Sequence, residues 1–224
     1  MSLEFIDQST DEEFGVRGTL HLPDNGGGDV LVFAHGAGGN QDSALSVAIA
    51  EEFSTAGISV FRIDLPYRQR RPKGPPTPAR SAVDRAGLRA AASLMRARFE
   101  GRVFVGGQSY GGRQSTILAS EDHNVADALF LTSYPLHPPG QPEKLRTEHL
   151  PGLQTPSFFV HGTCDNFGTV DEMEAALALI PVAREMHVVE GGGHGLVAKR
   201  EGPERLHKVV HELPRKFLKF ASRI

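Results

Sequence analysis

Short apolar runs alternate with helix-forming segments along most of this 224-residue chain, and the alternation is the strongest constraint on its fold. The runs end at glycine- or proline-rich turns, and they lie at residues 29–34, 58–63, 103–105, 126–132, 157–160 and 185–190. Continuously apolar runs are typical of strands that are buried on both faces of a parallel sheet. Strands that alternate with helices favour right-handed crossovers between them. We therefore predict an α/β fold, with a mostly parallel twisted sheet between helices on both faces, in a single domain over residues 1–224.

Two segments depart from this alternation. Residues 14–22 alternate between apolar and polar side chains and stop at a glycine-rich turn, which predicts a β-hairpin with the next apolar run. Residues 65–80 contain five prolines, which exclude a regular helix or a central strand there. Most other connections have helical patterns, and we predict helices at residues 43–56, 81–99, 113–120, 170–180 and 203–221.

The composition argues against several function classes. The formal net charge of −3 is close to neutral, so neither nucleic acid nor an anionic membrane is an expected partner. Cys164 is the only cysteine, so an internal disulfide is impossible, as suits a reducing compartment. The first residues lack the pattern of a signal peptide, and no apolar run approaches the roughly 20 residues that cross a bilayer. We expect a cytoplasmic protein, and the sequence leaves its oligomeric state unknown.

The run at residues 103–105 leads into residues 107–111, which have the pattern Gly-x-Ser-x-Gly. A helix-forming segment follows, and strand, sharp turn and helix in this order are the context of a nucleophile elbow. A serine between a strand end and a helix start has a strained backbone, and side chains at positions 107 and 111 would collide with the neighbouring turn. We therefore expect the hydroxyl of Ser109 to be exposed near a helix N-terminus.

Three other glycine-rich turns follow apolar runs. They are residues 35–39 (His-Gly-Ala-Gly-Gly), 161–165 (His-Gly-Thr-Cys-Asp) and 192–195 (Gly-Gly-His-Gly). With residues 107–111, they have the order oxyanion loop, nucleophile, acid and histidine of the α/β-hydrolase family, which this chain resembles from its first predicted strand to its C-terminus. Residues 134–140 resemble a small, lidless branch of the family that includes dienelactone-hydrolase-like bacterial proteins. The resemblance implies the α/β-hydrolase fold.

A neutral serine hydroxyl is a poor nucleophile and requires a base, and histidine is the side chain whose pKa suits that role near neutrality. Of the ten histidines, His194 is the predicted base, because small residues flank it in a turn directly after a strand and after Asp165. Asp165 would orient His194 and stabilise its imidazolium. The rival position for the acid in this family holds Ser133 and Tyr134, neither of which can substitute.

The other histidines and the cysteine receive different interpretations. The family resemblance implies that His35 and His161 are structural turn residues. His207 and His211 are four residues apart on the last predicted helix, a spacing that permits metal binding, but the glutamate of His-Glu-x-x-His is missing. A solvated helix face is the better interpretation, so we predict no metal, and no organic cofactor either. Cys164 is interpreted as a buried or half-buried bystander, because no elbow presents its thiol.

The negative charge of a tetrahedral intermediate requires preorganised hydrogen-bond donors. The predicted donors are the backbone N–H groups of Tyr110 and Ala37, with Gly38 as the alternative to Ala37. Many relatives insert a helical lid later in the chain, but only about twenty residues separate Ser133 from Pro156 here. A large lipid substrate is therefore not favoured.

Substrate contacts are predicted from two loops at strand ends. The proline-rich segment carries five basic and no acidic residues between positions 67 and 80, and from it we predict Tyr67, Arg70 and Arg71. From the loop after residue 132 we predict His137. The two arginines would steer an anionic ester or thioester toward the site. A solvated charged loop is the competing interpretation.

Together these residues predict a serine hydrolase that cleaves a small carboxylic ester or thioester through a Ser-His-Asp acyl-enzyme mechanism. The expected partner is therefore a small-molecule substrate. Amide or peptide cleavage by the same triad is one alternative. The other is a catalytically silent interaction module, because a fold does not guarantee a function.

Overall fold

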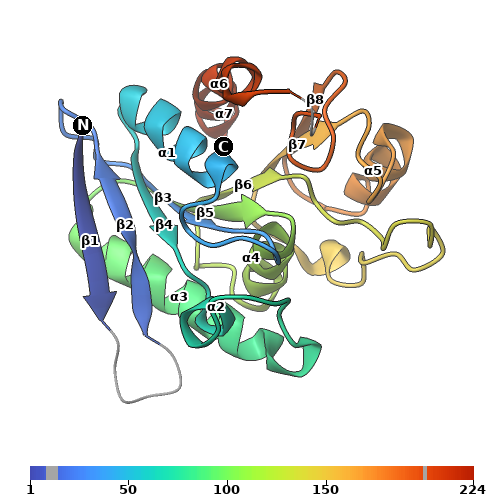
Figure 1. Ribbon diagram of the computed structural model, residues 1–224, viewed down its shortest axis with the longest axis horizontal. Helices are drawn as coiled ribbons and strands as arrows, with labels where there is room; N and C mark the ends of the chain where they lie inside the picture. The colour runs from blue at the N-terminus through green and yellow to red at the C-terminus, as the bar shows by residue number, and fades with distance from the viewer. Residues whose placement is uncertain (9–14, 199–200) are drawn as a thin grey trace.

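The computed structural model describes residues 1–8, 15–198 and 201–224. Within them, eight strands form one sheet in the order β1-β2-β4-β3-β5-β6-β7-β8, with helices on both faces (Figure 1). The strands are β1 (Ser2–Gln8), β2 (Val16–Leu22), β3 (Val30–Ala34), β4 (Ser59–Ile63), β5 (Val103–Gln108), β6 (Ala128–Thr132), β7 (Ser157–Gly162) and β8 (Arg184–Val189). Strands β3 to β8 run parallel to one another, and β1 and β2 add an antiparallel edge. The predicted, mostly parallel α/β sheet is confirmed.

The central strands bring the ends of several apolar runs to one edge of the sheet. Strands β3, β4, β6 and β7 are buried at every residue, as their continuous apolar sequences require. The register places Ala34 opposite Gly107 and Gln108 opposite Thr132, so the strands end side by side. In open parallel sheets this carboxyl edge is where ligands bind.

The prediction of a hairpin between residues 14–22 and the next apolar run is wrong. Strand β2 pairs with β1 and β4, whereas β3 lies between β4 and β5. The reason is burial: β3 is buried throughout and needs a strand on each side, whereas β2 alternates in burial and lies next to the edge. The edge strand β1 has one buried residue, and the sequence pattern does not predict it. Position 14, where the predicted run begins, lies outside the described residues.

Two helical layers enclose the sheet. Helices α1 (Ala44–Thr55), α6 (Pro203–His211) and α7 (Leu213–Ala221) cover one face, and α3 (Ser81–Arg98), α4 (Tyr110–Glu121) and α5 (Val170–Leu177) cover the other (Figure 1). On the first face, the ring centroid of Phe217 lies 4.9 Å from that of Phe104 and 5.3 Å from that of Phe130. The predicted last helix is divided into α6 and α7, because Pro214 has no N–H to continue the hydrogen-bond ladder.

The proline-rich segment is more regular than predicted. It contains a one-turn helix, α2 (Pro66–Arg70), and a 3₁₀ turn, η1 (Pro78–Arg80). Pro66 stands in the first turn of α2, where the missing N–H costs no hydrogen bond. The segment between β6 and β7, yellow in Figure 1, projects from one side of the molecule and contains the short turn η2 (Leu150–Gly152). No helix in the described parts of the chain combines the length and hydrophobicity needed to span a membrane.

Candidate active site

Ser109 lies in a sharp turn between β5 and α4. Its backbone has a φ of 50° and a ψ of −112°, a conformation that is strained for any residue except glycine. A Cβ atom at Gly107 or at Gly111 would lie 2.5 Å from the carbonyl oxygen of Ala34. Glycine is therefore required at both positions, because β3 passes too close for any side chain. This geometry is that of the predicted elbow.

Three predicted site residues form one hydrogen-bond chain. Ser109 Oγ lies 2.8 Å from His194 Nε2, and His194 Nδ1 lies 2.8 Å from Asp165 Oδ2 and 3.0 Å from Oδ1. The Asp165 carboxylate is fully buried and can only accept, so we assign the histidine proton to Nδ1. Nε2 is then free to accept the proton of Ser109. The turns after β5, β7 and β8 supply these residues, because the parallel strands end at one edge.

The turn after β7 also supplies Phe167, which supports both members of the Asp165–His194 pair. Its N–H donates to Asp165 Oδ1 at 2.9 Å, and its ring stacks on the imidazole of His194 with centroids 4.0 Å apart. The amide of Gln108 donates to the carbonyl of His194 at 3.4 Å. Phe167 is not among the residues predicted from the sequence. The available signal is an aromatic residue two positions after the acid, in an otherwise polar turn.

A cavity of about 480 Å³ opens beside Ser109. Ala37 and Tyr110 line it together with the serine, as expected of residues whose N–H groups face a reacting oxygen. The N–H of Tyr110 has no partner within the helix, because Tyr110 is the first residue of α4. Gly38, the alternative to Ala37, is exposed and lies outside the described lining.

The proline-rich segment forms part of the cavity wall, but through residues other than those predicted. Its contribution is Pro76, Pro78 and the adjacent Ser81 at the start of α3. None of the four predicted substrate contacts belongs to the described wall; they are Tyr67, Arg70, Arg71 and His137. The start of the segment instead packs against the oxyanion loop, where Tyr67 and Arg68 of α2 donate hydrogen bonds to backbone carbonyls.

Each of these side chains has other partners. Tyr67 is buried against the carbonyls of the oxyanion loop. Arg71 is exposed and donates to the carbonyl of Pro75 at 3.0 Å. His137 is buried, with Nδ1 2.8 Å from the carbonyl of Pro138 and Nε2 3.4 Å from Glu172. Burial raises the pKa of the Asp84 carboxyl, and the charge of the nearby Arg70 opposes part of that rise.

Two arginines that are not among the predicted residues do line the cavity, Arg113 and Arg146. Neither has a carboxylate within 4.0 Å among the described residues, and Arg113 Nε is buried without a hydrogen-bond partner. Arg146 donates to the carbonyl of Pro135 at 3.1 Å. Burial lowers the pKa of Arg146, and the charge of Arg113 lowers it further. Arg113 follows Ser109 by four residues, and this one-turn spacing is the signal that points to it.

Two of the remaining histidines, His207 and His211, share one acidic neighbour, Glu52. His211 Nδ1 lies 2.9 Å from Glu52 and His207 Nδ1 lies 4.0 Å from it, and both histidines are exposed. In the parts of the chain that the structure describes, no group of three His, Cys, Asp or Glu side chains is placed to hold a metal ion. His35 and His161 are fully buried at strand ends, as structural turn residues would be. The expectation that Cys164 is buried or half-buried is wrong, because the cysteine lies in the turn after β7 and is exposed.

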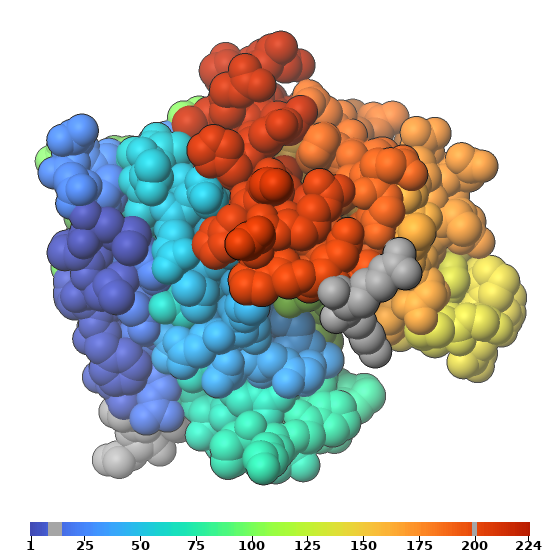
Figure 2. Space-filling view, turned by 45° about the horizontal axis from the view of Figure 1, so that its top comes forward, coloured from blue at the N-terminus to red at the C-terminus, as the bar shows by residue number. Residues whose placement is uncertain are grey.

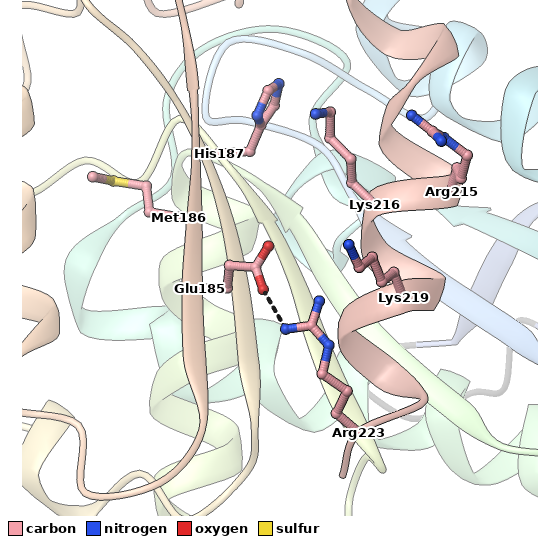
Figure 3. A pocket seen from close by; sticks show the side chains of 7 residues that line it. All are labelled: Glu185, Met186, His187, Arg215, Lys216, Lys219 and Arg223. Carbon is pink, nitrogen blue, oxygen red and sulfur yellow. Dashed lines mark hydrogen bonds and ion pairs between the residues drawn. The ribbon is translucent and has the colours of Figure 1, made fainter.

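A second hollow lies between β8 and α7 (Figure 3). Its wall includes Glu185 and His187 from β8 and Lys216 and Lys219 from α7, together with Arg223, which lies 3.4 Å from Glu185. It shares no described lining residue with the cavity beside Ser109, and no hydroxyl or thiol side chain lines it. We therefore place the candidate active site at Ser109.

Comparison with known proteins agrees with this architecture. A family model described as an alpha/beta hydrolase domain matches residues 27–222. The chain therefore belongs to the α/β-hydrolase family. The predicted resemblance to that family is confirmed.

Several solved structures share the fold. A dienelactone hydrolase from Anabaena variabilis has a TM-score of 0.73 and 20% identity, over 97% of each chain. Est1E from Butyrivibrio proteoclasticus has a TM-score of 0.73 and 14% identity, over 96% of this chain and 99% of that one. XC6422 from Xanthomonas campestris, described as a serine hydrolase without a lid, has a TM-score of 0.72 and 15% identity, over 96% and 94%. At these low sequence identities, the similarity shows only that the fold is shared. It is consistent with a small α/β-hydrolase.

Proposed function

We propose that this chain is a serine hydrolase that cleaves a small carboxylic ester or thioester. The observation that carries the proposal is the chain of short hydrogen bonds from Ser109 through His194 to Asp165, at the wall of a cavity. Such a chain lets a histidine accept the serine proton during attack while a buried carboxylate stabilises the imidazolium that forms. The family membership supports hydrolysis, and the site geometry supports serine as the nucleophile.

The reaction follows from these positions. Ser109 Oγ attacks the carbonyl carbon as its proton passes to His194 Nε2, and the N–H groups of Ala37 and Tyr110 stabilise the oxyanion. His194 then protonates the leaving alcohol or thiol, and the acyl group remains on Ser109. Water then attacks the acyl carbon as its proton passes to His194 Nε2. His194 returns that proton to Ser109 Oγ as the bond between Ser109 Oγ and the acyl carbon breaks and the carboxylic acid leaves. Asp165 orients the imidazole throughout.

The cavity also supports a charge preference in the substrate. Arg113 and Arg146 repel one another there, with no carboxylate within 4.0 Å of either in the described residues. The charge of Glu148 offsets this only in part, since burial and the charge of Arg113 still lower the pKa of Arg146. An anionic group on the acyl side of the ester would reduce the repulsion between the two arginines and give Arg113 Nε an acceptor. This preference replaces the predicted role of Arg70 and Arg71, which lie outside the wall.

Covalent labelling tests the nucleophile. We expect a fluorophosphonate to add to Ser109 of the wild-type protein, with the adduct located by peptide mass spectrometry. Ser109→Ala should lose the adduct and the burst of p-nitrophenol from p-nitrophenyl acetate, while keeping its melting temperature, because the hydroxyl points away from the core. Turnover of that ester by Ser109→Ala at the wild-type rate would contradict the proposal.

A matched pair of substrates tests the charge preference. Mono-p-nitrophenyl adipate carries a free carboxylate, and p-nitrophenyl hexanoate has the same chain length without one. Arg113→Gln and Arg146→Gln should each lower kcat/KM for the adipate roughly tenfold more than for the hexanoate, as expected when a hydrogen bond to a charged group is lost. Arg71→Gln, outside the cavity, is the control. Equal losses on both substrates would show that the arginines do not bind the carboxylate.

A further inference from the structure

The hydroxyl of Tyr67 holds the loop that carries Ala37. It lies 2.9 Å from the carbonyl oxygen of Ala37 and 3.2 Å from that of Gly36. Tyr67 is 3% exposed, and burial raises the pKa of its phenol to about 12, so the hydroxyl keeps its proton and donates. In a trans peptide the C=O and N–H groups point in opposite directions. A Gly36 carbonyl that faces Tyr67 therefore directs the Ala37 N–H away from Tyr67, as its role as oxyanion donor requires.

Other groups converge on the same loop. His35 Nε2 accepts the N–H of Leu65 at 3.2 Å, which leaves the proton of a neutral imidazole on Nδ1. Nδ1 then donates to the Gly36 carbonyl at 2.8 Å. Burial lowers the pKa of His35, so the ring is neutral and this tautomer is fixed. The carbonyl whose peptide carries the Ala37 N–H is thus held by two side chains.

The buried, positively charged side chain of Arg68 also holds this loop in place. Its guanidinium donates to the carbonyls of Gly39 at 2.7 Å and Ala37 at 3.2 Å. It also donates at 3.1 Å to the carbonyls of Arg71 and Gly74 in the proline-rich segment. No carboxylate of the described residues lies within 4.0 Å of it, and a buried cation is costly unless its hydrogen bonds are satisfied. In Figure 2 the residues near position 40, light blue, lie beside those near position 75, teal.

Asp84 connects this assembly to the second predicted donor. The carboxylate is 1% exposed; Oδ1 accepts the backbone N–H of Tyr67 at 2.9 Å, and Oδ2 accepts the Tyr110 hydroxyl at 2.7 Å. Tyr110 lines the cavity and is the residue predicted to supply the second oxyanion donor through its own N–H. The rings of Tyr67 and Tyr110 meet edge to face, with centroids 5.7 Å apart. The buried carboxylate of Asp84 therefore contacts both Tyr67, which holds the Ala37 carbonyl, and Tyr110, which carries the other predicted donor.

We infer that Tyr67, Arg68 and Asp84 are positioning residues that fix the Ala37 and Tyr110 N–H groups as a preformed oxyanion hole. The inference rests on the proposed function of Ser109. These side chains contact the backbone and each other and do not line the described cavity. They therefore act on the stabilisation of the intermediate and leave ground-state binding of the substrate unaffected.

Tyr67→Phe tests the inference, because it removes one hydroxyl and keeps the ring. With p-nitrophenyl acetate, kcat should fall about tenfold to a hundredfold, less than the loss that follows removal of an oxyanion donor itself, while KM changes less than twofold. The affinity for a boronic acid, which forms a tetrahedral adduct with the serine, should fall in the same proportion as kcat. A residue that merely stabilises the fold would not couple these two quantities.

Two further variants keep the result interpretable. Tyr134→Phe removes another buried phenol hydroxyl, which donates to the carbonyl of Arg146, and should leave kcat and boronic acid affinity within twofold of wild type. Arg68→Lys keeps the charge but loses the multiple hydrogen bonds, and should lower kcat as Tyr67→Phe does. Melting temperatures identify any variant that is unfolded at the assay temperature. If either Tyr67→Phe or Arg68→Lys is unfolded, the kcat and boronic acid affinity of the other variant test the inference.

The outcomes separate the inference from the function on which it rests. A wild-type protein that a fluorophosphonate does not label at Ser109 would overturn the proposed function. A labelled, active wild-type protein, with folded Tyr67→Phe and Arg68→Lys variants that keep kcat and boronic acid affinity within twofold, would overturn the positioning role alone. Parallel losses of kcat and boronic acid affinity in the variants, with an unaffected Tyr134→Phe control, would support it.

Discussion

Ser109 adopts a positive φ because its neighbours leave no other path for the chain. A Cβ at Gly106 would lie 1.8 Å from the carbonyl oxygen of Phe130, so β5 passes close to β6 immediately before the turn. A strained backbone of this kind costs about 1–3 kcal/mol and persists only when surrounding structure enforces it. Here the close approach of three strands enforces it, and the strain presents the hydroxyl to the cavity.

The second glycine of the elbow gives a prediction for stability. A Cβ at Gly111 would lie 2.5 Å from the carbonyl oxygen of Ala34 and 2.7 Å from that of His35, and backbone atoms of a central strand cannot yield. Although alanine is favoured over glycine in a helix by up to about 1 kcal/mol, overpacking dominates. We expect Gly111→Ala to lower the free energy of unfolding by about 1–3 kcal/mol in urea titrations.

Gly152→Ala is the matched control, because its Cβ would meet no atom within 4 Å. We expect that change to alter the free energy of unfolding by less than about 0.5 kcal/mol. Equal effects at positions 111 and 152 would show that the close contact with β3 is not what requires glycine in the elbow.

At the scale of elements, the antiparallel edge is joined to the parallel sheet by a buried polar contact. His21 of β2 is 2% exposed, and its Nε2 accepts a hydrogen bond from Arg62 Nε of β4 at 2.8 Å. Burial, with a smaller effect of the Arg62 charge, lowers the pKa of His21 to about 4. The native protein therefore holds this histidine neutral across a pH range in which an unfolded chain would protonate it.

The sign of the resulting pH dependence follows from that difference. Between the unfolded pKa of about 6.5 and the folded pKa, the unfolded state binds the additional proton, so stability falls as the pH falls through this window. The free energy of unfolding of the wild-type protein should fall between pH 7 and pH 5. In His21→Gln, which retains an acceptor for Arg62, we expect this fall to be smaller by about 1–2 kcal/mol. Urea titrations at both pH values measure it. His123→Gln, at an exposed position, is the control, and an unchanged pH dependence in His21→Gln would contradict the assignment.

At the scale of the whole molecule, the sequence predicts the strands that its repeated apolar runs form. It does not predict the features that depend on contacts between distant parts of the chain. Continuous apolar runs, each followed by a glycine- or proline-rich turn, predict the parallel strands and place Ser109, Asp165 and His194 at one edge. This prediction succeeds because an apolar run that is buried on both faces fits few positions in a fold other than a central strand. Strand order is different: β3 lies between β4 and β5 although β2 precedes it in sequence, and only the demand for neighbours on both sides decides that.

The missed residues share a physical reason. Asp84 lies on an amphipathic helix, where a carboxylate at any position is usually solvated, and only the approach of α2 and Tyr110 buries it. Arg146 lies in an irregular segment whose path no periodicity describes. Tyr67 is predicted as part of the site but lies one layer behind its surface, because a one-turn helix redirects the chain. Side chains that act through tertiary contacts leave little trace in a local pattern.

Three prolines in the cavity wall have a consequence for how this site can change. Pro76, Pro78 and Pro135 come from two different loops, and each has a φ that its own ring restricts. A wall of this kind loses little conformational freedom when a ligand binds, but it also adapts little to a ligand of another shape. New acyl groups would then be accommodated by replacing wall residues, through point substitutions in the two loops, rather than by induced fit. Relatives that differ in these prolines are the place to look for divergent specificity.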